Sequence, residues 1–375
     1  MTRGRLVVRK RNGETMDSAL PTISIIVATY NEERTIGAML RNTLAVRYPT
    51  EKMEILVVDG ASTDQTCKVV ERVDDKRVRL VRQVSRSGWN CAVQEGLRQA
   101  KGDIVVLSGA DVFYDSEAMA RLCGHFEDPQ VGAATGRQVL FNDDETLSTR
   151  MEREYQKSQD FVSAAESILD QPFYSRGEIV AVRKWIMNAV AKRMGDGAGG
   201  SLDAYVPFET KAQGQRFVFD PEAIYSEYAP STVRERLGMQ VRRGRQLIGS
   251  AARYAWMVWK PRFGKFGMLI LPCHLAMLTV MPWVFLIGSL SITLATLSHP
   301  YYLCAFIPPV AIALQTRGRA WLASLALAQV SLALAMCSMV VGKTYLIKTV
   351  ESTRRLPEPV TVNHANNLSN SLSLA

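Results

Sequence analysis

The sequence predicts an α/β fold built around a Rossmann-like mixed sheet. Three short apolar runs, within residues 23–27, 54–58 and 103–107, each end abruptly in polar residues. Such a run is typical of a buried parallel strand that delivers side chains to the carboxyl edge of a sheet, where α/β folds bind their ligands. A helical segment between the first two runs completes a β-α-β unit.

Polar side chains gather where the first two strands end. Ala28, Tyr30 and Glu32 stand at the first edge and Asp59 at the second. No G-x-G-x-x-G or Walker pattern follows either strand, so acidic and amide groups are expected to read a base and a ribose there. The alternative is that Asn31 caps a helix and Asp59 only ends a strand, since Asn and Asp are preferred helix caps.

The third run leads into Gly109-Ala110-Asp111. The order of V-A-T-Y-N-E-E, V-V-D-G-A-S-T-D and A-K-G-D-I-V-V-L-S-G-A-D resembles the family 2 inverting glycosyltransferases, which bind nucleotide sugars on a GT-A domain. Most members read D-A-D at the third edge, and the position kept here as Asp111 is the one that holds the metal on the diphosphate. The resemblance implies Mg²⁺ or Mn²⁺ at Asp111, because phosphates and water can supply the other oxygen ligands. The alternative is a turn aspartate after a strand.

Arg86 is a further candidate phosphate contact. It lies beside residues 88–97, which resemble the family's G-K-x-x-A-L-N-x-G-L stretch. Trp89 stands there in place of the usual lysine, so Arg86 is expected to substitute for that contact.

Asp203 is the candidate catalytic base. Residues 200–204 and 214–223 are similar to the family segments E-D-x-D and G-Y-R-V-x-Y-D-P-E-A. In that alignment Asp203 replaces the carboxylate that deprotonates the acceptor hydroxyl, whereas Leu202 and Tyr205 replace the acidic residues around it. An inverting transfer is a single displacement, so a carboxylate must take the proton as the acceptor oxygen attacks. The alternative is an ordinary aspartate at the start of a helix.

The segment Gln240-Val-Arg-Arg-Gly244 resembles the Q-x-x-R-W motif of membrane-bound polysaccharide synthases, with glycine in place of tryptophan. Gln240 and Arg243 share a helix face, and arginine is a natural bidentate partner of phosphate, so both are expected at the donor diphosphate. Because the tryptophan offers a stacking face for the acceptor sugar, Gly244 favours the addition of one sugar over polymerisation. The alternative is a basic helix that only faces a membrane.

The last third of the chain is expected to be a membrane region. Between residues 266 and 342 the only formal charges are Arg317 and Arg319, a stretch of low charge that is far too long for the core of a soluble domain. Two of its apolar runs are long enough to cross a hydrocarbon core. The three apolar runs of this region are Met268–Leu297, Tyr301–Leu314 and Trp321–Val341.

The topology follows from charge. The amino terminus shows no secretory signal, so the catalytic domain is expected in the cytoplasm. The loop with Arg317 and Arg319 competes for the cytoplasmic side with the tail that carries Lys343, Lys348, Arg354 and Arg355. The positive-inside rule favours the tail, which has more basic residues, and this requires an even number of crossings. The first apolar run, which contains Pro272 and Pro282, is expected to fold back or to lie partly in the interface.

Basic residues concentrate just before the apolar third. Nine Lys or Arg residues lie between Arg234 and Lys265, interleaved with Tyr254, Trp256 and Trp259. This composition suits a segment on an anionic cytoplasmic leaflet, with aromatic rings at headgroup depth. A nucleic-acid patch is the competing interpretation. The adjacent apolar third favours the membrane, and no nucleic-acid partner is expected.

Together these features predict an amino-terminal extension over 1–20, a cytoplasmic GT-A domain over 21–232, a basic amphipathic interface segment over 233–265, transmembrane helices over 266–345 and a tail over 346–375. The expected activity is an inverting, metal-dependent transfer from a nucleotide diphosphate sugar, with UDP as the expected nucleotide, to a lipid-linked acceptor at the inner membrane, in the synthesis of an exopolysaccharide or surface glycan. The alternatives are a processive polysaccharide synthase and a catalytically inactive membrane scaffold.

Overall fold

The computed structural model describes residues 20–195, 200–299, 301, 304, 315–341 and 351–356. Residues 1–19 of the expected amino-terminal extension, most of the run Tyr301–Leu314 and the tail beyond residue 356 lie outside the described residues. The strands are β1 Ile23–Thr29, β2 Met53–Asp59, β3 Val78–Arg82, β4 Ile104–Ser108, β5 Phe113–Tyr114, β6 Val131–Leu140, β7 Val180–Arg183 and β8 Arg216–Glu227. The helices are α1 Ile36–Leu44, α2 Thr66–Glu71, α3 Trp89–Gln99, α4 Ala118–Gly124, α5 Leu147–Leu169, α6 Lys184–Met194, α7 Leu202–Ala212, α8 Val233–Arg253, α9 Leu271–Thr279, α10 Met281–Ser298 and α12 Thr316–Val340.

All of these strands form one mixed sheet, in the order β3-β2-β1-β4-β7-β6-β8-β5. The first four strands in that order are parallel, β7 is antiparallel to both β4 and β6, and β8 is parallel to β6. The three strands expected from the sequence are β2, β1 and β4, which lie side by side and are almost completely buried. The Rossmann-like mixed sheet is therefore confirmed, and the carboxyl ends of its parallel strands share one edge.

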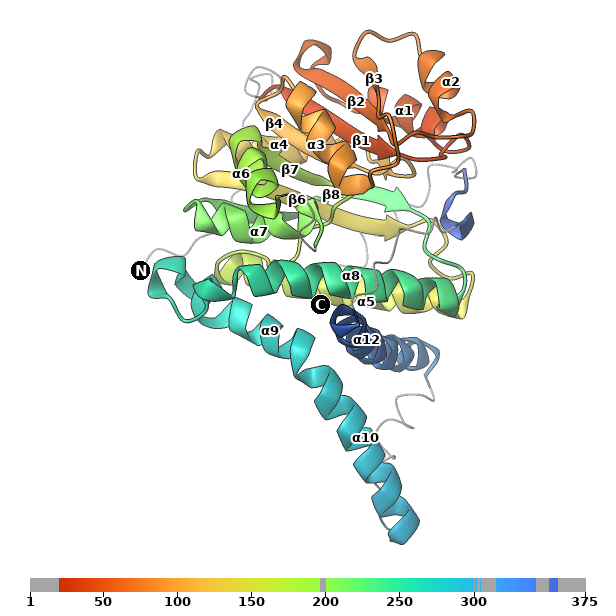
Figure 1. The fold of residues 1–375 in the computed structure, drawn as a ribbon, viewed down its shortest axis with the longest axis vertical. Coiled ribbons are helices and arrows are strands. Elements are labelled where there is room, and N and C mark those ends of the chain that lie inside the picture. Colours follow the sequence, from red (N-terminus) through yellow and green to blue (C-terminus); the bar gives the residue numbers. More distant parts are fainter. Residues whose placement is uncertain are drawn as a thin grey trace.

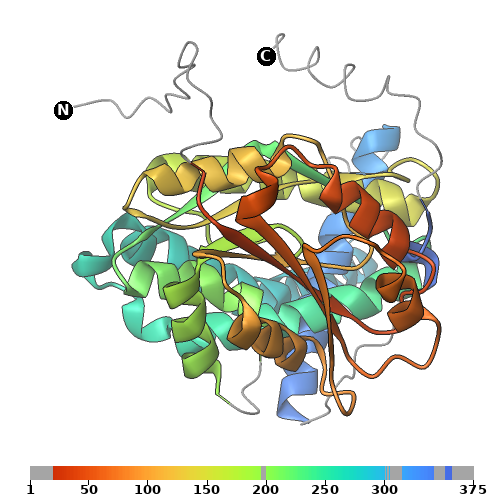
Figure 2. The same cartoon turned by 90° about the horizontal axis from the view of Figure 1, so that it is seen from above.

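Helices cover both faces of the sheet (Figures 1 and 2). One apolar core contains residues of α1, α2 and α4, and the other contains residues of α3, α6 and α7. The close approach of α3 to β1 requires Gly96, because an added Cβ would lie 2.6 Å from Cγ2 of Ile26. A side chain at this position would have no room in a core packed at normal density.

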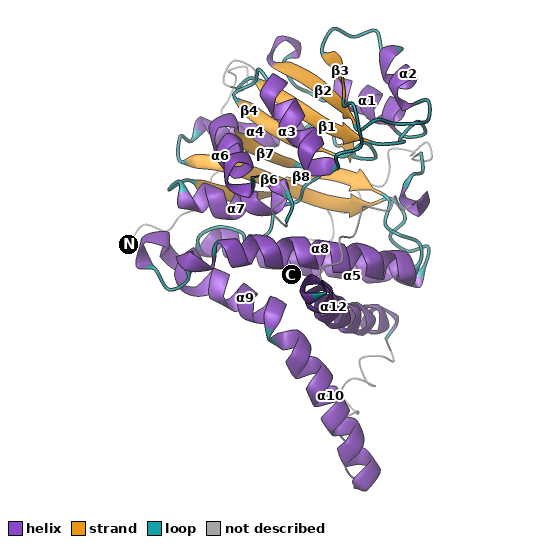
Figure 3. Cartoon of the chain, in the orientation of Figure 1, coloured by secondary structure: helices purple, strands orange, loops and turns teal. Residues whose placement is uncertain are grey.

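A group of helices lies next to the sheet domain (Figure 3). Helices α5 and α8 lie beneath the sheet, and α12 packs on both of them (Figure 1). The core on the α3 face continues through Val241 of α8 and Tyr254 to Leu271 of α9. The expected boundary at residue 233 therefore does not separate two packing units, because α8 shares its core with the sheet domain.

Two helical segments, Met281–Ser298 and Gly318–Val340, are long and apolar enough to cross a membrane. The run Met268–Leu297 begins as the π-helix Phe266–Ile270 and continues as α9 and α10, which meet at Val280. Figure 1 shows α10 extending away from the sheet domain in nearly the direction of α9. The prolines therefore divide this run into two helices without folding it back on itself.

Candidate active site

The loops that follow β1 and β2 are bonded to each other. The backbone N–H of Asn31 donates to the Ser62 hydroxyl at 2.8 Å, and the backbone N–H of Thr63 donates to Oδ1 of Asn31 at 2.8 Å. Asn31 has a φ of 54°, a conformation that asparagine tolerates better than most residues. Asn31 therefore fixes the turn at the sheet edge and is not the cap of a helix, since α1 is preceded by Thr35.

Asp59 is buried at the end of β2, paired in register with Thr29, one residue beyond Ala28. Its carboxylate accepts hydrogen bonds from the Ser62 backbone N–H at 3.0 Å and from the Ser62 hydroxyl. The Thr29 hydroxyl donates a third hydrogen bond to it at 3.4 Å. These hydrogen bonds hold the Asp59 carboxylate in place, so Asp59 stabilises the loop at this edge of the sheet. Direct contacts of Ala28 and Asp59 with a nucleoside stay predictions.

Arg86 and Tyr30 meet at this edge. The guanidinium carbon of Arg86 lies 3.9 Å from the centroid of the Tyr30 ring. This is the geometry of a cation–π contact, which holds a positive charge against an aromatic face. The structure thus brings together two of the residues expected at the nucleotide, although their roles there stay predictions.

Arg354 reaches the same edge from the far end of the chain. Its Nη2 donates to the carbonyl oxygen of Tyr30 at 3.0 Å and forms an ion pair with Glu32. Burial and the negative charge of Asp111 raise the pKa of Glu32 to about 7, against the opposing effect of Arg354. Arg354 was not predicted as a site residue, because no local pattern shows where the end of the chain docks.

The segment 351–356, called here the C-terminal strap, is fixed to the loop between β8 and α8 and to the first turn of α8. Oγ of Ser352 donates to Glu235 at 2.9 Å and accepts from the Ser231 backbone N–H at 3.3 Å, and the Tyr228 hydroxyl donates to the Leu356 carbonyl at 3.2 Å. The strap therefore packs on the catalytic domain.

Asp111 lies just beyond β4 and is half-buried. A Cβ added at Gly109 would lie 3.0 Å from Oδ1 of Asp111, so glycine at this position leaves room for the carboxylate. Burial and the negative charge of Glu178 raise the pKa of Asp111 to about 6.

Asp203 occupies the first turn of α7 and bonds the hydroxyl of Ser201. The loop before β7 closes over the carboxylate, because a Cβ at Gly177 would lie 2.6 Å from Oδ2 of Asp203. Burial raises the pKa of Asp203 to about 6, the Ser201 bond opposes that rise, and the charge of Glu178 adds to it. A free aspartate at a helix start would be stabilised in its charged form, so the raised pKa distinguishes Asp203 from that ordinary case.

Glu178 links the two carboxylates. Its negative charge raises the pKa of both Asp111 and Asp203, and its Oε1 lies 3.8 Å from Nη2 of Arg243. The Tyr114 hydroxyl holds its backbone by donating to the Glu178 carbonyl at 3.0 Å. Glu178 was not predicted from the sequence. The available signal was a carboxylate that directly precedes a buried apolar run.

Glu227 is a second unpredicted carboxylate at this site. It ends β8 and bonds the side-chain amide of Gln138. Burial, together with the charges of Glu178 and Asp111, raises its pKa well above the ordinary value. The signal for Glu227 was the same as for Asp59, an acidic residue at the end of a strand.

Arg243 projects from α8 between two carboxylates. Its Nη1 lies 3.8 Å from Glu152 and its Nη2 lies 3.8 Å from Glu178. Burial lowers the pKa of Arg243, but Tyr174, Glu178 and Glu152 outweigh burial and raise it well above the ordinary value, so the guanidinium stays charged. One turn earlier, Gln240 is half-buried, and its Oε1 is buried with no hydrogen-bond partner among the described residues.

The alternative of a helix that only faces a membrane is wrong for α8. Arg236 is completely buried, and it donates to Glu152 at 2.9 Å, to the Met151 carbonyl at 3.2 Å and to the Ser324 hydroxyl of α12 at 3.2 Å. Leaving such a charge without its partner would be strongly destabilising. Arg236 thus joins α5, α8 and α12, and the guanidinium of Arg243 lies at the acidic site, where the charges of Glu178 and Asp203 also act on Arg242.

Gly244 does not leave an open sugar platform. It is buried, and an added Cβ would lie 3.3 Å from Cβ of Ala335 and 3.3 Å from Cδ2 of Leu332. Helix α12 therefore fills the space beside Gly244 that the missing tryptophan was expected to leave open. The physical role of this glycine is the close packing of α8 on α12, so it carries no information on product length.

We expect Gly244→Trp to destabilise the protein by about 3 kcal/mol or more, because overpacking a tight interface forces the helices apart. Gly238→Trp is the matched control on the same helix, since a Cβ there meets nothing within 4 Å. Thermal unfolding in detergent measures both. Equal stability of the two variants would contradict the packing role of Gly244.

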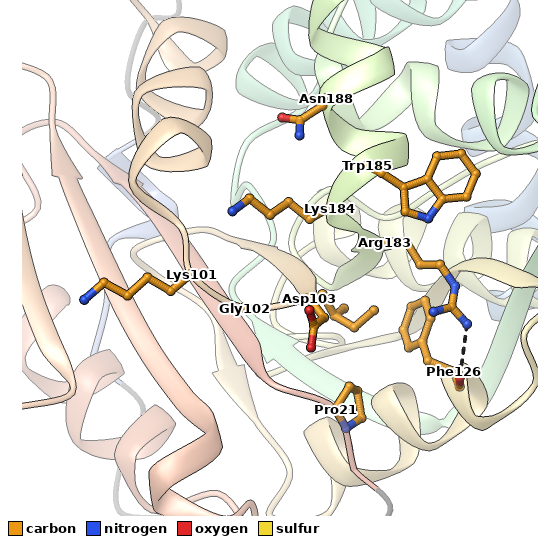
Figure 4. A pocket seen from close by; sticks show the side chains of 10 residues that line it. Pro21, Lys101, Gly102, Asp103, Phe126, Arg183, Lys184, Trp185 and Asn188 are labelled. Carbon is orange, nitrogen blue, oxygen red and sulfur yellow. Dashed lines mark hydrogen bonds between the residues drawn. The ribbon is translucent and has the colours of Figure 1, made fainter.

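A cavity of about 510 Å³ lies at the opposite edge of the sheet, lined in part by Gly102, Asp103 and Lys184 (Figure 4). The Arg183 guanidinium beside it is already bonded to the carbonyl oxygens of Phe126 and Asp128. None of the predicted site residues lines this cavity. It is therefore separate from the site at the carboxyl edge.

The acidic site fits a divalent cation held jointly with a substrate. Burial and the charge of Glu178 raise the pKa of Asp111, so a bound cation that neutralises these carboxylates would be stabilising. Within the described residues, no three His, Cys, Asp or Glu side chains form a ready-made metal cage. The site therefore suits Mg²⁺ or Mn²⁺, which binds through one or two carboxylates plus substrate phosphates and water.

The comparisons with known proteins agree with this architecture. Residues 24–187, which include Asp59, Asp111 and Glu178, match the family model of Glycosyl transferase family 2. Poly-beta-1,6-N-acetyl-D-glucosamine synthase of Staphylococcus aureus is 26% identical over 225 residues, which are 57% of this chain and 52% of the relative. Beta-monoglucosyldiacylglycerol synthase of Synechocystis sp. is 28% identical over 142 residues, 37% of this chain and 30% of the relative. The chain thus spans about half the length, or less, of these curated relatives.

A solved structure extends the likeness beyond the family match. The mannosyltransferase PcManGT from Pyrobaculum calidifontis, in complex with GDP-Man and Mn²⁺, is 25% identical, with a TM-score of 0.70, and the likeness covers 87% of this chain and 88% of that chain. The family model over residues 24–187, the shared GT-A fold and the glycosyltransferase relatives together identify a Glycosyl transferase family 2 domain in this chain.

Proposed function

We propose that the chain is an inverting glycosyltransferase that moves a sugar from a nucleotide diphosphate sugar to a lipid-linked acceptor at the cytoplasmic face of the inner membrane. The observation that carries this proposal is that the charge of Glu178 acts on both Asp111 and Asp203 while Glu178 itself lies 3.8 Å from Arg243. Four segments that are far apart in the sequence supply these groups. These are the chemical groups that a single displacement at an anomeric carbon requires.

Asp203 is the proposed base. A pKa of about 6 leaves its carboxylate ionised at neutral pH, yet makes it a stronger base than an ordinary aspartate. It would take the proton of the acceptor hydroxyl as the oxygen attacks the sugar from the face opposite the diphosphate. Ser201 orients the carboxylate, because its hydroxyl bonds Asp203 from the helix start.

The leaving diphosphate gains negative charge during the transfer, so fixed positive charge beside it lowers the barrier. Arg243 is proposed for this task, with Gln240, Arg86 and Arg354 as further contacts of the donor. Asp111 would hold Mg²⁺ or Mn²⁺ against the diphosphate, and that cation would supply charge neutralisation. The Tyr30 to Glu32 edge with Ala28 and Asp59 would hold the nucleoside.

The acceptor is proposed to be lipid-linked because two apolar helices adjoin the catalytic domain. The names of the two curated relatives, one a polysaccharide synthase and the other a glycolipid synthase, support a role in a surface glycan. The polysaccharide synthase relative also keeps a processive enzyme as the second candidate. An inactive scaffold is disfavoured by the glycosyltransferase relatives and by the acidic site with Arg243.

The test is transfer by the purified full chain, incubated with a panel of UDP- and GDP-sugars and with membrane lipid extract. We expect one donor to label a lipid product. A ladder or a polymer from one donor would favour the processive synthase. Labelling of no lipid by any donor, with free sugar released instead, would contradict a lipid-linked acceptor.

Arg354→Ala is expected to raise the KM for the donor about 10-fold to 100-fold, because a charge-assisted hydrogen bond to a buried phosphate is worth about 1.5–3 kcal/mol. Arg355→Ala is the matched control. Arg355 also lies on the strap, but its ion pair with Glu145 is half-exposed, and such pairs contribute little. Steady-state kinetics with a varied donor concentration decides, and an equal KM in both variants would remove Arg354 from the donor site.

A further inference from the structure

The loop between α8 and α9, residues 254–265, is called here the interface loop. It presents aromatic rings to the outside where the chain passes from the catalytic domain to the apolar helices. Trp256 is 37% exposed and Trp259 is 72% exposed. Just beyond the loop, Met268 and Leu269 are also exposed. A cluster of exposed large apolar side chains is more typical of a binding surface than of an ordinary solvent-facing loop.

Two cations converge on one of these rings. The ammonium nitrogen of Lys260 lies 5.2 Å from the Trp256 ring centroid, and the guanidinium carbon of Arg262 lies 5.4 Å from it and 4.6 Å from that of Phe263. Both side chains are exposed. Among the ion pairs of the described residues, neither cation has a carboxylate partner. Their positive charge is therefore available to an anion from outside the chain.

A pocket of about 230 Å³ lies directly beside these cations. It is lined by Lys211, Ala212, Gly214, Trp256, Arg262 and Phe263. Its wall is fixed, because Asp170 pairs with Lys211 and also accepts the Phe266 backbone N–H at 2.9 Å. The Trp256 and Phe263 rings meet edge to face, with centroids 5.2 Å apart. The pocket thus combines a rigid aromatic wall with positive charge.

The pocket is separate from the site of sugar transfer. Asp203 lies in the first turn of α7 and Lys211 in its last turn. Eight residues of helix separate them by about 12 Å along the axis. None of the residues that line the pocket belongs to the acidic site.

We propose that this pocket binds the phosphodiester head group of an anionic membrane phospholipid. Lys260 and Arg262 would pair with the phosphate, Trp256 would lie at headgroup depth, and Met268 and Leu269 would contact the acyl chains. The position of the loop directly before α9 and α10 favours a lipid over a soluble anion. The inference rests on the membrane placement in the proposed function, and to the anionic leaflet expected from the sequence it adds a defined pocket and the residues that bind the head group.

The test uses the full chain purified in a neutral detergent and titrated with phosphatidylglycerol or with phosphatidylcholine of the same acyl chains. Thermal unfolding reports binding, because a ligand of the folded state raises Tm. We expect phosphatidylglycerol to raise Tm at concentrations at which phosphatidylcholine does not. The double variant Lys260→Gln with Arg262→Gln should bind phosphatidylglycerol at least about tenfold more weakly, since each cation near a lipid surface contributes to the affinity.

Lys68→Gln with Arg72→Gln is the matched control. It also removes one lysine and one arginine that are exposed and without an ion pair among the described residues, but at α2, far from the apolar helices (Figure 1). This control should keep the preference for phosphatidylglycerol. The single variant Lys260→Gln changes one exposed side chain and should lose part of the preference for phosphatidylglycerol. It provides the same test if the double variant does not fold.

No preference in the wild-type protein, or an unchanged preference in the double variant, would overturn the proposal. So would inorganic phosphate raising Tm as effectively as the lipid, because the site would then bind a soluble anion. Sugar transfer in detergent is measured on every variant. Normal transfer without lipid preference refutes this inference alone, whereas loss of lipid labelling in all the proteins, the wild type included, refutes the proposed function.

Discussion

Asp203→Asn is expected to lower the rate of transfer by about 100-fold to 10,000-fold, which is the usual cost of losing a general base. The amide is nearly isosteric but cannot take the acceptor proton. Binding of the nucleotide diphosphate should be nearly unchanged, because the base acts on the acceptor. Single-turnover transfer and calorimetric donor binding, measured on the same preparation, separate the two effects.

The pH dependence gives a second reading of the same residue. Burial raises the pKa of Asp203 to about 6, so the wild-type rate should rise as the pH increases through about 6 and level off above 7, when the base is ionised. The residual rate of Asp203→Asn should lack this limb. Asp144→Asn, on the exposed surface, is the control and should behave like the wild type. Transfer by Asp203→Asn at a near-normal rate would exclude Asp203 as the base.

Asp111→Ala is expected to eliminate the stimulation of nucleotide-diphosphate binding by Mg²⁺ or Mn²⁺. In the wild-type protein the cation should strengthen binding about tenfold or more, because it neutralises both the diphosphate and the carboxylates around Glu178. Removing the single carboxylate ligand leaves the cation without its protein anchor. Calorimetry with and without a chelator measures both proteins.

The outcome also decides whether the enzyme uses a metal at all. Equal affinity with and without chelator in the wild-type protein would mean that Arg243 and neighbouring cations neutralise the diphosphate alone. Asp144→Asn should keep the wild-type response. A response that persists in Asp111→Ala would place the cation on another group of the site.

The sequence by itself determined the sheet around the active site. The strands β1, β2 and β4 were predicted because each is a short apolar run with a sharp polar end, a pattern set by residues that are adjacent in the chain. Asp111 and Asp203 were chosen as candidates on the same local evidence together with the family resemblance. In the structure, the negative charge of Glu178 acts on both Asp111 and Asp203, and Glu178 was not predicted as a site residue.

Only the tertiary structure decided which groups surround these candidates. Glu178 and Glu227 face Asp111 because β7 and β8 enter the sheet beyond β4, and that strand order depends on contacts between distant segments. Arg354 reaches Tyr30 and Glu32 because the C-terminal strap docks on the loop before α8. No local pattern encodes such a contact.

The same reason explains the two corrections on α8. Its sequence shows a basic, amphipathic helix, which suits a membrane surface as well as a buried interface. Packing of α12 along α8 buries Arg236 against Glu152 and places Leu332 and Ala335 over Gly244. Periodicity reports which residues share a helix face, but it does not report what covers that face. The sequence therefore determined the elements and the chemistry at their ends, and the packing of distant helices and the strap decided the composition of the site.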